Sequence, residues 1–240
     1  MIGLGTVINV VGIVAGGLGG YFLGGRFSDR YQEGLNTACG VSVLFIGIAG
    51  AMSGMLSIAD GSLSSGQSML VVGCLVLGAL IGELINIEGI FERFGEWLKY
   101  KTGNGKDKLF VDGFVTASLT VCIGAMAVVG AIQDGIYGDY SVLATKAVLD
   151  LIIVLVMTCS LGIGCVFSAV PVAAFEGAMT VLARLLKPIM TETALFNLSM
   201  IGSVLIFCVG LNLIWGKRVR VANLLPALVL AVASAFLPLG

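Results

Sequence analysis

Residues 141–163, SVLATKAVLDLIIVLVMTCSLGI, form one of several long apolar stretches in this chain of 240 residues. A helix that crosses the hydrocarbon core of a bilayer needs about 20 mostly apolar residues, and this stretch meets that length. It also contains Lys146 and Asp150, which lie on one face of a helix because they are four residues apart. The stretch therefore predicts a membrane-spanning helix with two opposite charges inside it.

The composition supports the same class for the whole chain. Hydrophobic residues make up 58% of the sequence, charged residues only 11%, and the mean hydropathy is +1.07. A soluble monomer of this size cannot bury so much apolar surface, and disordered chains are poor in apolar residues. The net charge of −1 argues against a nucleic acid partner. We expect one integral membrane domain over residues 1–240, an all-α polytopic bundle surrounded by the lipid bilayer.

Eight apolar runs are long enough to be spans. They cover about residues 4–25, 36–57, 68–87, 110–132, 141–163, 166–186, 196–215 and 222–239. The fifth and sixth runs are nearly continuous, so a seven-span layout, with one broken element in their place, stays open. The sequence of residues 43–47 is similar to that of residues 205–210. This similarity would fit inverted repeats of spans one to three and six to eight, as in many secondary transporters.

Lys and Arg gather in the loops on one side of the predicted bundle. The other side carries Arg184 and Lys187. Because cytoplasmic loops collect Lys and Arg, we expect the basic loops to be cytoplasmic and both termini to lie outside. The cytoplasmic set is Arg26, Arg30, Arg93, Lys99, Lys101, Lys106, Lys108, Lys217, Arg218 and Arg220.

The long connection after the third run, at about 88–109, has an amphipathic pattern. Its apolar side chains fall on one helical face, which predicts a cytoplasmic helix that lies in the membrane interface. The helix would serve either as an anchor among the lipid headgroups or as a docking surface for a soluble partner. The apolar residues are Ile90, Phe91, Phe94, Trp97 and Leu98.

Glycines recur at four-residue steps in the first run. Small residues at this spacing let helix backbones approach closely, so we expect tight packing inside the bundle or between the protomers of a homo-oligomer. The alternative is a smooth wall beside a permeation path. These glycines are Gly12, Gly16, Gly20 and Gly24.

Charged residues at membrane depth are the strongest candidates for a functional site. A charge near the centre of a span costs about 3 kcal/mol on insertion scales, so such groups face the interior and find partners. Glu176 lies near the middle of the sixth run, five residues after Pro171, where a broken helix would free carbonyl groups for ions. We therefore predict a site where the fifth and sixth spans meet, formed by Lys146, Asp150, Ser168 and Glu176.

The predicted site has a formal charge of −1, which favours a proton or a small cation over an anion. Two structural interpretations stay open: a self-neutralising pair of Lys146 and Asp150, and a kink satisfied by nearby Ser and Thr. Three other polar residues are secondary candidates. Glu83 lies where the third span leaves the membrane, whereas Asn9 and Asn212 are deeper and would hydrogen-bond between helices.

The sequence resembles the YdfK/YqgA-like family of bacterial membrane proteins, known as domain of unknown function 554. The resemblance implies a bacterial inner or plasma membrane protein, and it supplies no substrate and no residue roles. The matching stretches cover nearly the whole chain. They are residues 5–9, 82–83, 114–119, 122–126, 133–135, Lys146 with Asp150, 162–164, 167–169 and 223–226.

Taken together, these features predict a small transporter or channel for an ion or small solute, with a proton or cation site near Asp150. The rival hypothesis is a non-transporting membrane scaffold or sensor that acts through residues 88–113. We expect no enzymatic activity, no cofactor and no metal site, because the chain has no histidine and its six cysteines lack metal-ligand spacing.

Overall fold

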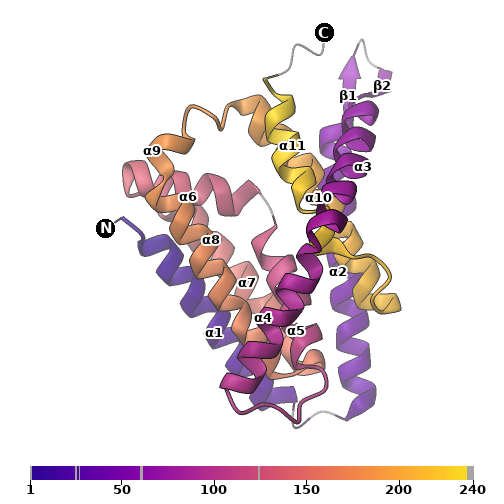
Figure 1. The fold of residues 1–240 in the computed structure, drawn as a ribbon, viewed down its shortest axis with the longest axis vertical. Helices are drawn as coiled ribbons and strands as arrows, with labels where there is room; N and C mark the ends of the chain where they lie inside the picture. Colours follow the sequence, from indigo (N-terminus) through magenta and orange to yellow (C-terminus); the bar gives the residue numbers. More distant parts are fainter. Residues whose placement is uncertain (1, 25, 27, 60–61, 124, 237–240) are drawn as a thin grey trace.

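The computed structural model describes residues 2–24, 26, 28–59, 62–123 and 125–236, which are almost entirely helical (Figure 1). This confirms the all-α polytopic bundle. The helices are α1 (Leu4–Gly24), α2 (Asp29–Met55), α3 (Ser68–Ile85), α4 (Ile87–Lys101), α5 (Phe110–Cys122), α6 (Ala125–Tyr137), α7 (Ser141–Leu161), α8 (Ala169–Val181), α9 (Ala183–Leu186), α10 (Glu192–Trp215) and α11 (Pro226–Ser234). Two 3-10 helices, η1 (Ile163–Ser168) and η2 (Val221–Leu224), and a hairpin of β1 (Leu56–Ala59) and β2 (Ser62–Ser65) complete the described elements.

Six helical segments of the described chain are long and apolar enough to cross a membrane. They are α1, α2, α3, α7, the continuous segment of η1 and α8, and α10. The pair of α5 and α6, bent by 62°, would make a seventh. The eighth expected span, 222–239, falls on η2 and the short α11, and its last residues lie outside the described range. The count of eight therefore stays a prediction.

The fifth and sixth predicted runs are two separate elements that run in opposite directions. Gly12 and Gly24 lie against Ala147 and Cys159, so α7 runs parallel to α1. Asn9 contacts Glu176, whereas Gly17, further along α1, contacts Val166, so α8 runs antiparallel to α1. The chain turns at Gly162, whose φ of +81° is in the region that favours glycine.

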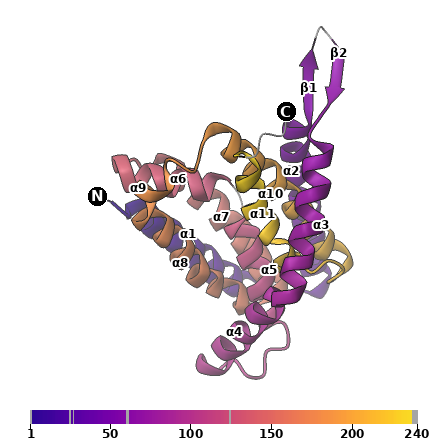
Figure 2. The same ribbon diagram turned by 45° about the horizontal axis from the view of Figure 1, so that its top comes forward.

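The helices form two groups that lie side by side in both views (Figures 1 and 2). One group contains α1, α6, α7 and α8, and the other contains α2, α3, α10 and α11. Helix α5 packs against η1, α7 and α8, and α4 packs against α5. All four predicted packing glycines of α1 lie along α7, at Ala147, Leu151, Leu155 and Cys159.

Hydrogen bonds define two ends of the bundle. At the first, which we call the basic end, Gln32 donates to the carbonyl of Gly24, Asn36 to that of Leu213, and Ser160 to that of Gln32. At the opposite end, the amide of Gly5 donates to Asp134, and Asn197 donates to Ser234. The start of α1 and the end of α11 therefore lie at the same end of the molecule.

The apolar side chains of the predicted interfacial helix, α4, do not all face the same surroundings. Leu98 is buried and Gly95 lies against Phe114 of α5. Ile90 and Trp97 instead point away from the chain and are more than half exposed. The predicted apolar face is thus shared between α5 and the surroundings of the molecule, and Figure 2 shows α4 leaving the bundle at the end away from the hairpin.

Candidate functional site

Three ionisable side chains meet inside the bundle, between α1, α7 and α8. Lys146 and Asp150, one turn apart on α7, form an ion pair. Oε1 of Glu176 on α8 lies 3.5 Å from Nζ of Lys146. The exposed fractions are 6% for Lys146, 5% for Asp150 and 1% for Glu176. The structure thus brings together three of the four residues that the sequence places in the site.

Two further groups complete this cluster. Nδ2 of Asn9 donates a hydrogen bond of 2.8 Å to Oε1 of Glu176, and Nζ of Lys146 donates one of 2.7 Å to the carbonyl of Val121. Asn9 was predicted only as a secondary candidate. We define the central cluster as Lys146, Asp150, Glu176, Asn9 and the carbonyl of Val121.

The carbonyl of Val121 is available because α5 ends at Cys122 and α6 continues at an angle. The apolar pattern predicted one continuous span over 110–132, without this break. The only signal for it was the glycine at position 124, which lies outside the described residues. As expected for a broken helix in a membrane, a freed carbonyl contacts a charged side chain. The chain is also broken at Gly162 and η1, between α7 and α8, but the carbonyl that bonds to Lys146 comes from the break between α5 and α6.

Ser168 is the one predicted site residue that the structure does not bring to the cluster. It lies eight residues before Glu176 at the start of α8, and at 1.5 Å per residue this is roughly 12 Å along the helix axis. Its buried hydroxyl makes no hydrogen bond with any described residue. A role for Ser168 in the ion path therefore stays a prediction, and the structure places this residue outside the central cluster.

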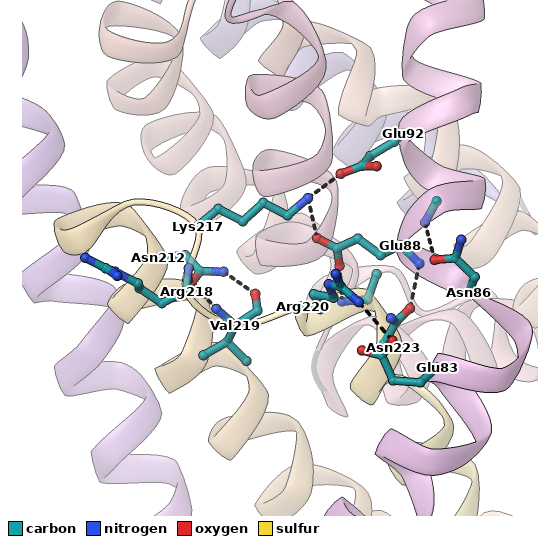
Figure 3. Close-up of polar contacts among 12 residues, drawn as sticks. Glu83, Asn86, Glu88, Glu92, Asn212, Lys217, Arg218, Val219, Arg220 and Asn223 are labelled. Atoms are coloured by element: carbon teal, nitrogen blue, oxygen red, sulfur yellow. Dashed lines mark hydrogen bonds and ion pairs between the residues drawn. The ribbon is translucent and has the colours of Figure 1, made fainter.

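A second polar cluster lies at the basic end, where α3 meets α4 and the segment after α10 (Figure 3). Nζ of Lys217 forms ion pairs with Glu88, at 2.9 Å, and with Glu92. The buried carboxylate of Glu88 also accepts a hydrogen bond of 3.0 Å from the amide of Ala222. The amide of Glu88 donates to Oδ1 of Asn223 at 2.8 Å. These contacts connect α4 to residues 217–223.

The charge of Lys217 is stabilised by this cluster. Burial lowers its pKa, but the ion pairs with Glu92 and Glu88 outweigh burial, and the pKa of Lys217 lies above the ordinary lysine value. The side chain is still 44% exposed, so the cluster is in contact with solvent.

The remaining secondary candidates, Glu83 and Asn212, belong to this second cluster. Glu83 is half exposed and pairs with Arg220 at 3.0 Å. Asn212 donates to the carbonyl of Val219 at 2.7 Å and accepts from the amides of Arg218 and Val219. Asn212 therefore fixes the turn after α10 and does not make the expected bond between two spans.

A cavity of about 370 Å³ lies at the basic end, next to the second cluster. Acidic and amide side chains contribute to its lining, and α5 adds Thr116 and Leu119, which lie further from the start of α5 than Asp112. Leu119 is only two residues before Val121, whose carbonyl holds Lys146. The charged and amide residues of the lining are Glu33, Asn36, Glu88, Asp112, Asn212 and Lys217.

The central cluster has more acidic groups than basic ones. Its two carboxylates share one ammonium group, and Oε2 of Glu176 has no hydrogen-bond partner among the described residues. No group of three or more His, Cys, Asp or Glu in the described part of the chain could hold a metal ion.

Comparisons with known proteins agree with the predicted resemblance. The family described as "Protein of unknown function (DUF554)" matches residues 4–236. The chain is 28% identical over 233 residues to the "Uncharacterized membrane protein YdfK" of Bacillus subtilis (strain 168), covering 97% of this chain and 95% of that protein. It is 27% identical over 233 residues to the "Uncharacterized protein YqgA" of Escherichia coli (strain K12), covering 95% of this chain and 94% of that protein. No solved structure matches the chain significantly. The match over nearly the full length shows that this multi-pass membrane protein belongs to the DUF554 family.

Proposed function

We propose that the protein is a transporter or channel for a proton or small monovalent cation in the bacterial plasma membrane. The observation that carries this proposal is the burial of Lys146, Asp150 and Glu176 together inside the helical bundle. Ionisable residues in membrane spans are costly, at about 3 kcal/mol each on insertion scales, and they mark ion pathways and proton relays.

The unequal number of charges gives the central cluster its function. With Lys146 charged, one of the two carboxylates has no full counter-charge, so the cluster attracts a proton or a cation. Lys146 lies between both carboxylates and also bonds to the carbonyl of Val121. A cation bound at Asp150 or Glu176 would compete with Lys146 for oxygen atoms, and the ammonium group would then rely on the other carboxylate and the carbonyl.

The cavity at the basic end supports access from that side. It is lined by acidic side chains, which raise the local concentration of cations, and it extends inward to Leu119. The central cluster itself is shielded from solvent, with exposed fractions of 6% or less. We therefore assign this conformation to an occluded state, in which the inner part of α5 separates the cavity from the site.

The direct test is Asp150→Asn in purified protein reconstituted into vesicles, with proton, Na⁺ and K⁺ flux measured separately. Asparagine keeps the size of the side chain and removes its charge. Losing a charged hydrogen-bond partner costs about 1.5–3 kcal/mol, which corresponds to roughly ten- to a hundredfold weaker binding. We expect flux of the transported ion to fall by at least this factor, whereas Asp139→Asn, in the exposed loop before α7, leaves flux unchanged.

Normal flux in correctly folded Asp150→Asn would remove the central cluster from the transport path. Absence of flux for all three ions in the wild-type protein would contradict the proposed function itself. Thermal unfolding in detergent shows whether each variant is folded.

One observation favours the rival function, a scaffold or sensor that acts through α4. Ile90, Trp97 and Tyr100 form exposed apolar surface on this helix, with Tyr100 86% exposed. Deleting α4 would remove the buried Leu98 and uncover the buried Phe114 of α5, so the double variant Trp97→Ala with Tyr100→Ala is the better test. In a scaffold it abolishes the cellular function that Asp150→Asn leaves intact, and in a transporter it leaves flux intact.

We also propose that the protein acts without enzymatic activity and as a homo-oligomer. The glycines of α1 are already packed against α7 of the same chain, so they do not supply the contact between protomers. Helices α2 and α3 carry many exposed apolar side chains, which face lipid or a second copy. Mass measurement of the protein in lipid nanodiscs distinguishes a monomer from an oligomer.

A further inference from the structure

Five buried polar atoms between α1, α6 and α8 have no hydrogen-bond partner among the described residues. The large majority of buried side-chain polar atoms in proteins are bonded to protein or to ordered water, so several unpartnered atoms in one place indicate water or an ion. Each of these residues is at least nine-tenths buried. The atoms are Oγ1 of Thr6, Oδ1 of Asn9, Oδ1 of Asp134, Oε2 of Glu176 and Oγ1 of Thr180.

The five residues occupy two successive levels of the helix group. The first level is the central cluster, where Asn9 of α1 donates to Glu176 of α8. Thr6 lies three residues from Asn9 towards the start of α1, and Thr180 lies four residues from Glu176 towards the end of α8. Because α1 and α8 are antiparallel, both threonines lie about one helical turn further towards the opposite end.

Asp134 joins the threonines at this second level. Its Oδ2 accepts a hydrogen bond of 2.9 Å from the amide of Gly5, next to Thr6. The following residue, Gly135, packs directly against the backbone carbonyl of Thr180. Three helices thus bring Thr6, Asp134 and Thr180 to one level of the bundle, and Tyr137, three residues further along α6, is exposed.

We propose that Asp134, Thr6 and Thr180 form a second, hydrated site for a proton or small monovalent cation, which connects the central cluster to the end of the bundle opposite the basic end. The site rests on the proposed transport function and supplies its second access route. One carboxylate oxygen and two hydroxyls are ligands that suit a hydrated cation or a chain of water molecules. Asp134 adds the only full charge of the three.

Stabilisation of α1 is the alternative role for Asp134, since its carboxylate bonds to the first turn of that helix. That role explains why Oδ2 of Asp134 is buried, because this oxygen accepts the bond from Gly5. It does not explain why Oδ1 of Asp134 and the hydroxyls of the two threonines are buried without a hydrogen-bond partner among the described residues. A helix-capping function also needs only a hydrogen-bond acceptor, which the amide of asparagine would keep. This difference makes the two roles separable by experiment.

The first experiment measures water access to the second site without requiring transport. Thr180→Cys is modified with a small, charged, membrane-impermeant thiol reagent, added separately to each side of the membrane in sealed vesicles. Asp139→Cys, in the exposed loop before α7, identifies the side on which the opposite end lies. Val172→Cys is the matched control, because Val172 is fully buried on the same helix, four residues from Glu176 in the other direction.

We expect Thr180→Cys to react from the side that labels Asp139→Cys, at least tenfold faster than Val172→Cys and above the background of the native cysteines. Thr6→Cys should behave like Thr180→Cys, which guards against a folding defect in one variant. Equal rates at positions 180 and 172, whether both are slow or both fast, would overturn the second site. The proposed function would survive that result, because its own test is the flux of Asp150→Asn.

The second experiment separates cation binding from helix capping. We expect Asp134→Asn to raise the ion concentration that gives half-maximal flux by tenfold or more, with thermal stability unchanged. Measuring proton flux and Na⁺ or K⁺ flux in separate runs identifies which ion uses the site. Unchanged flux at every ion concentration would assign Asp134 to capping of α1 and would overturn the proposal.

Discussion

Gly16 of α1 shows how a single residue determines the packing of two helices. A Cβ atom built at this position would lie 2.2 Å from the carbonyl oxygen of Leu151, so even a methyl group requires α1 and α7 to separate. Gly19, three residues on, has room, because its Cβ would lie 3.7 Å from the nearest atom, in Leu155. The two glycines of one helix thus form a matched pair.

We expect Gly16→Ala to lower the free energy of unfolding by about 1–3 kcal/mol, the usual cost of overpacking. Gly19→Ala should have no effect or a slightly stabilising one, since alanine favours a helix more than glycine does. Unfolding of the purified variants in mixed micelles with increasing SDS measures both values. Equal stability of the two variants would mean that α1 and α7 do not pack as described.

At the residue scale, the sequence predicted the contact between two residues of the same helix. Lys146 and Asp150 pair because a spacing of four residues is sufficient on any helix. The remaining members of the central cluster depend on which helices meet. Asn9 and Glu176 are 167 residues apart, and no pattern along the chain shows that they are in contact. Asp134, which the predicted spans placed in a loop, is buried for the same reason.

At the scale of elements, α4 is connected to the rest of the bundle through Glu88. This buried carboxylate contacts both Lys217 and the amide of Ala222. Glu92, in contrast, is partly exposed, and among the described residues its side chain forms an ion pair with Lys217 alone. Exposed ion pairs contribute about 0–1 kcal/mol, whereas a buried donor left without its acceptor costs about 1–3 kcal/mol.

Glu88→Ala should therefore destabilise the protein clearly, whereas Glu92→Ala should be nearly neutral. Glu88→Gln should fall between them, because its amide oxygen can still accept from Ala222. Thermal unfolding in detergent, monitored by circular dichroism, gives the three values. If Glu92→Ala were the most harmful of the three, the hydrogen bond to Ala222 would not be what connects α4 to the bundle.

The ion pairs of Lys217 also predict a dependence on pH. Since the pKa of Lys217 is raised in the folded protein, its ion pairs stabilise the fold fully below the ordinary lysine pKa of about 10.4. This contribution is lost as the pH rises through the raised pKa. The difference in stability between the unchanged protein and Lys217→Met should accordingly be constant near neutral pH and shrink only above pH about 10.

The helices were easier to predict from the sequence than the bend and the hairpin that interrupt them. The long apolar runs correspond to helices because hydropathy over about 20 residues is a property of the local sequence. The bend between α5 and α6 was not predicted, since both halves are apolar and no proline lies between them. The hairpin of β1 and β2 was also missed, because its strands have only four residues each.

At the scale of the whole molecule, the contact between α2 and α10 has the form expected for an inverted repeat. Gly47 and Gly210 end the two stretches whose sequences resemble each other. Gly47 packs against Phe207 and Gly210 packs against Leu44. Each glycine thus contacts the residue three positions before the other glycine, as a two-fold axis between antiparallel helices requires. The repeat itself stays a prediction, as does its extension to the other spans.

The distribution of basic residues between the two ends of the bundle predicts how the molecule is oriented in the membrane. The ten basic residues of the predicted cytoplasmic side lie in the loops after α1, α4 and α10, in the first turn of α2 and in α4 itself. They adjoin the basic end, whereas the loop at Asp139 belongs to the opposite end with the start of α1 and the end of α11. Because Lys and Arg favour the cytoplasmic side, Gly105→Cys, in the loop before α5, should react with an impermeant thiol reagent only after spheroplasts are opened. Asp139→Cys should react in intact spheroplasts. The reverse labelling pattern would place the termini in the cytoplasm and would reverse the direction assigned to both access routes.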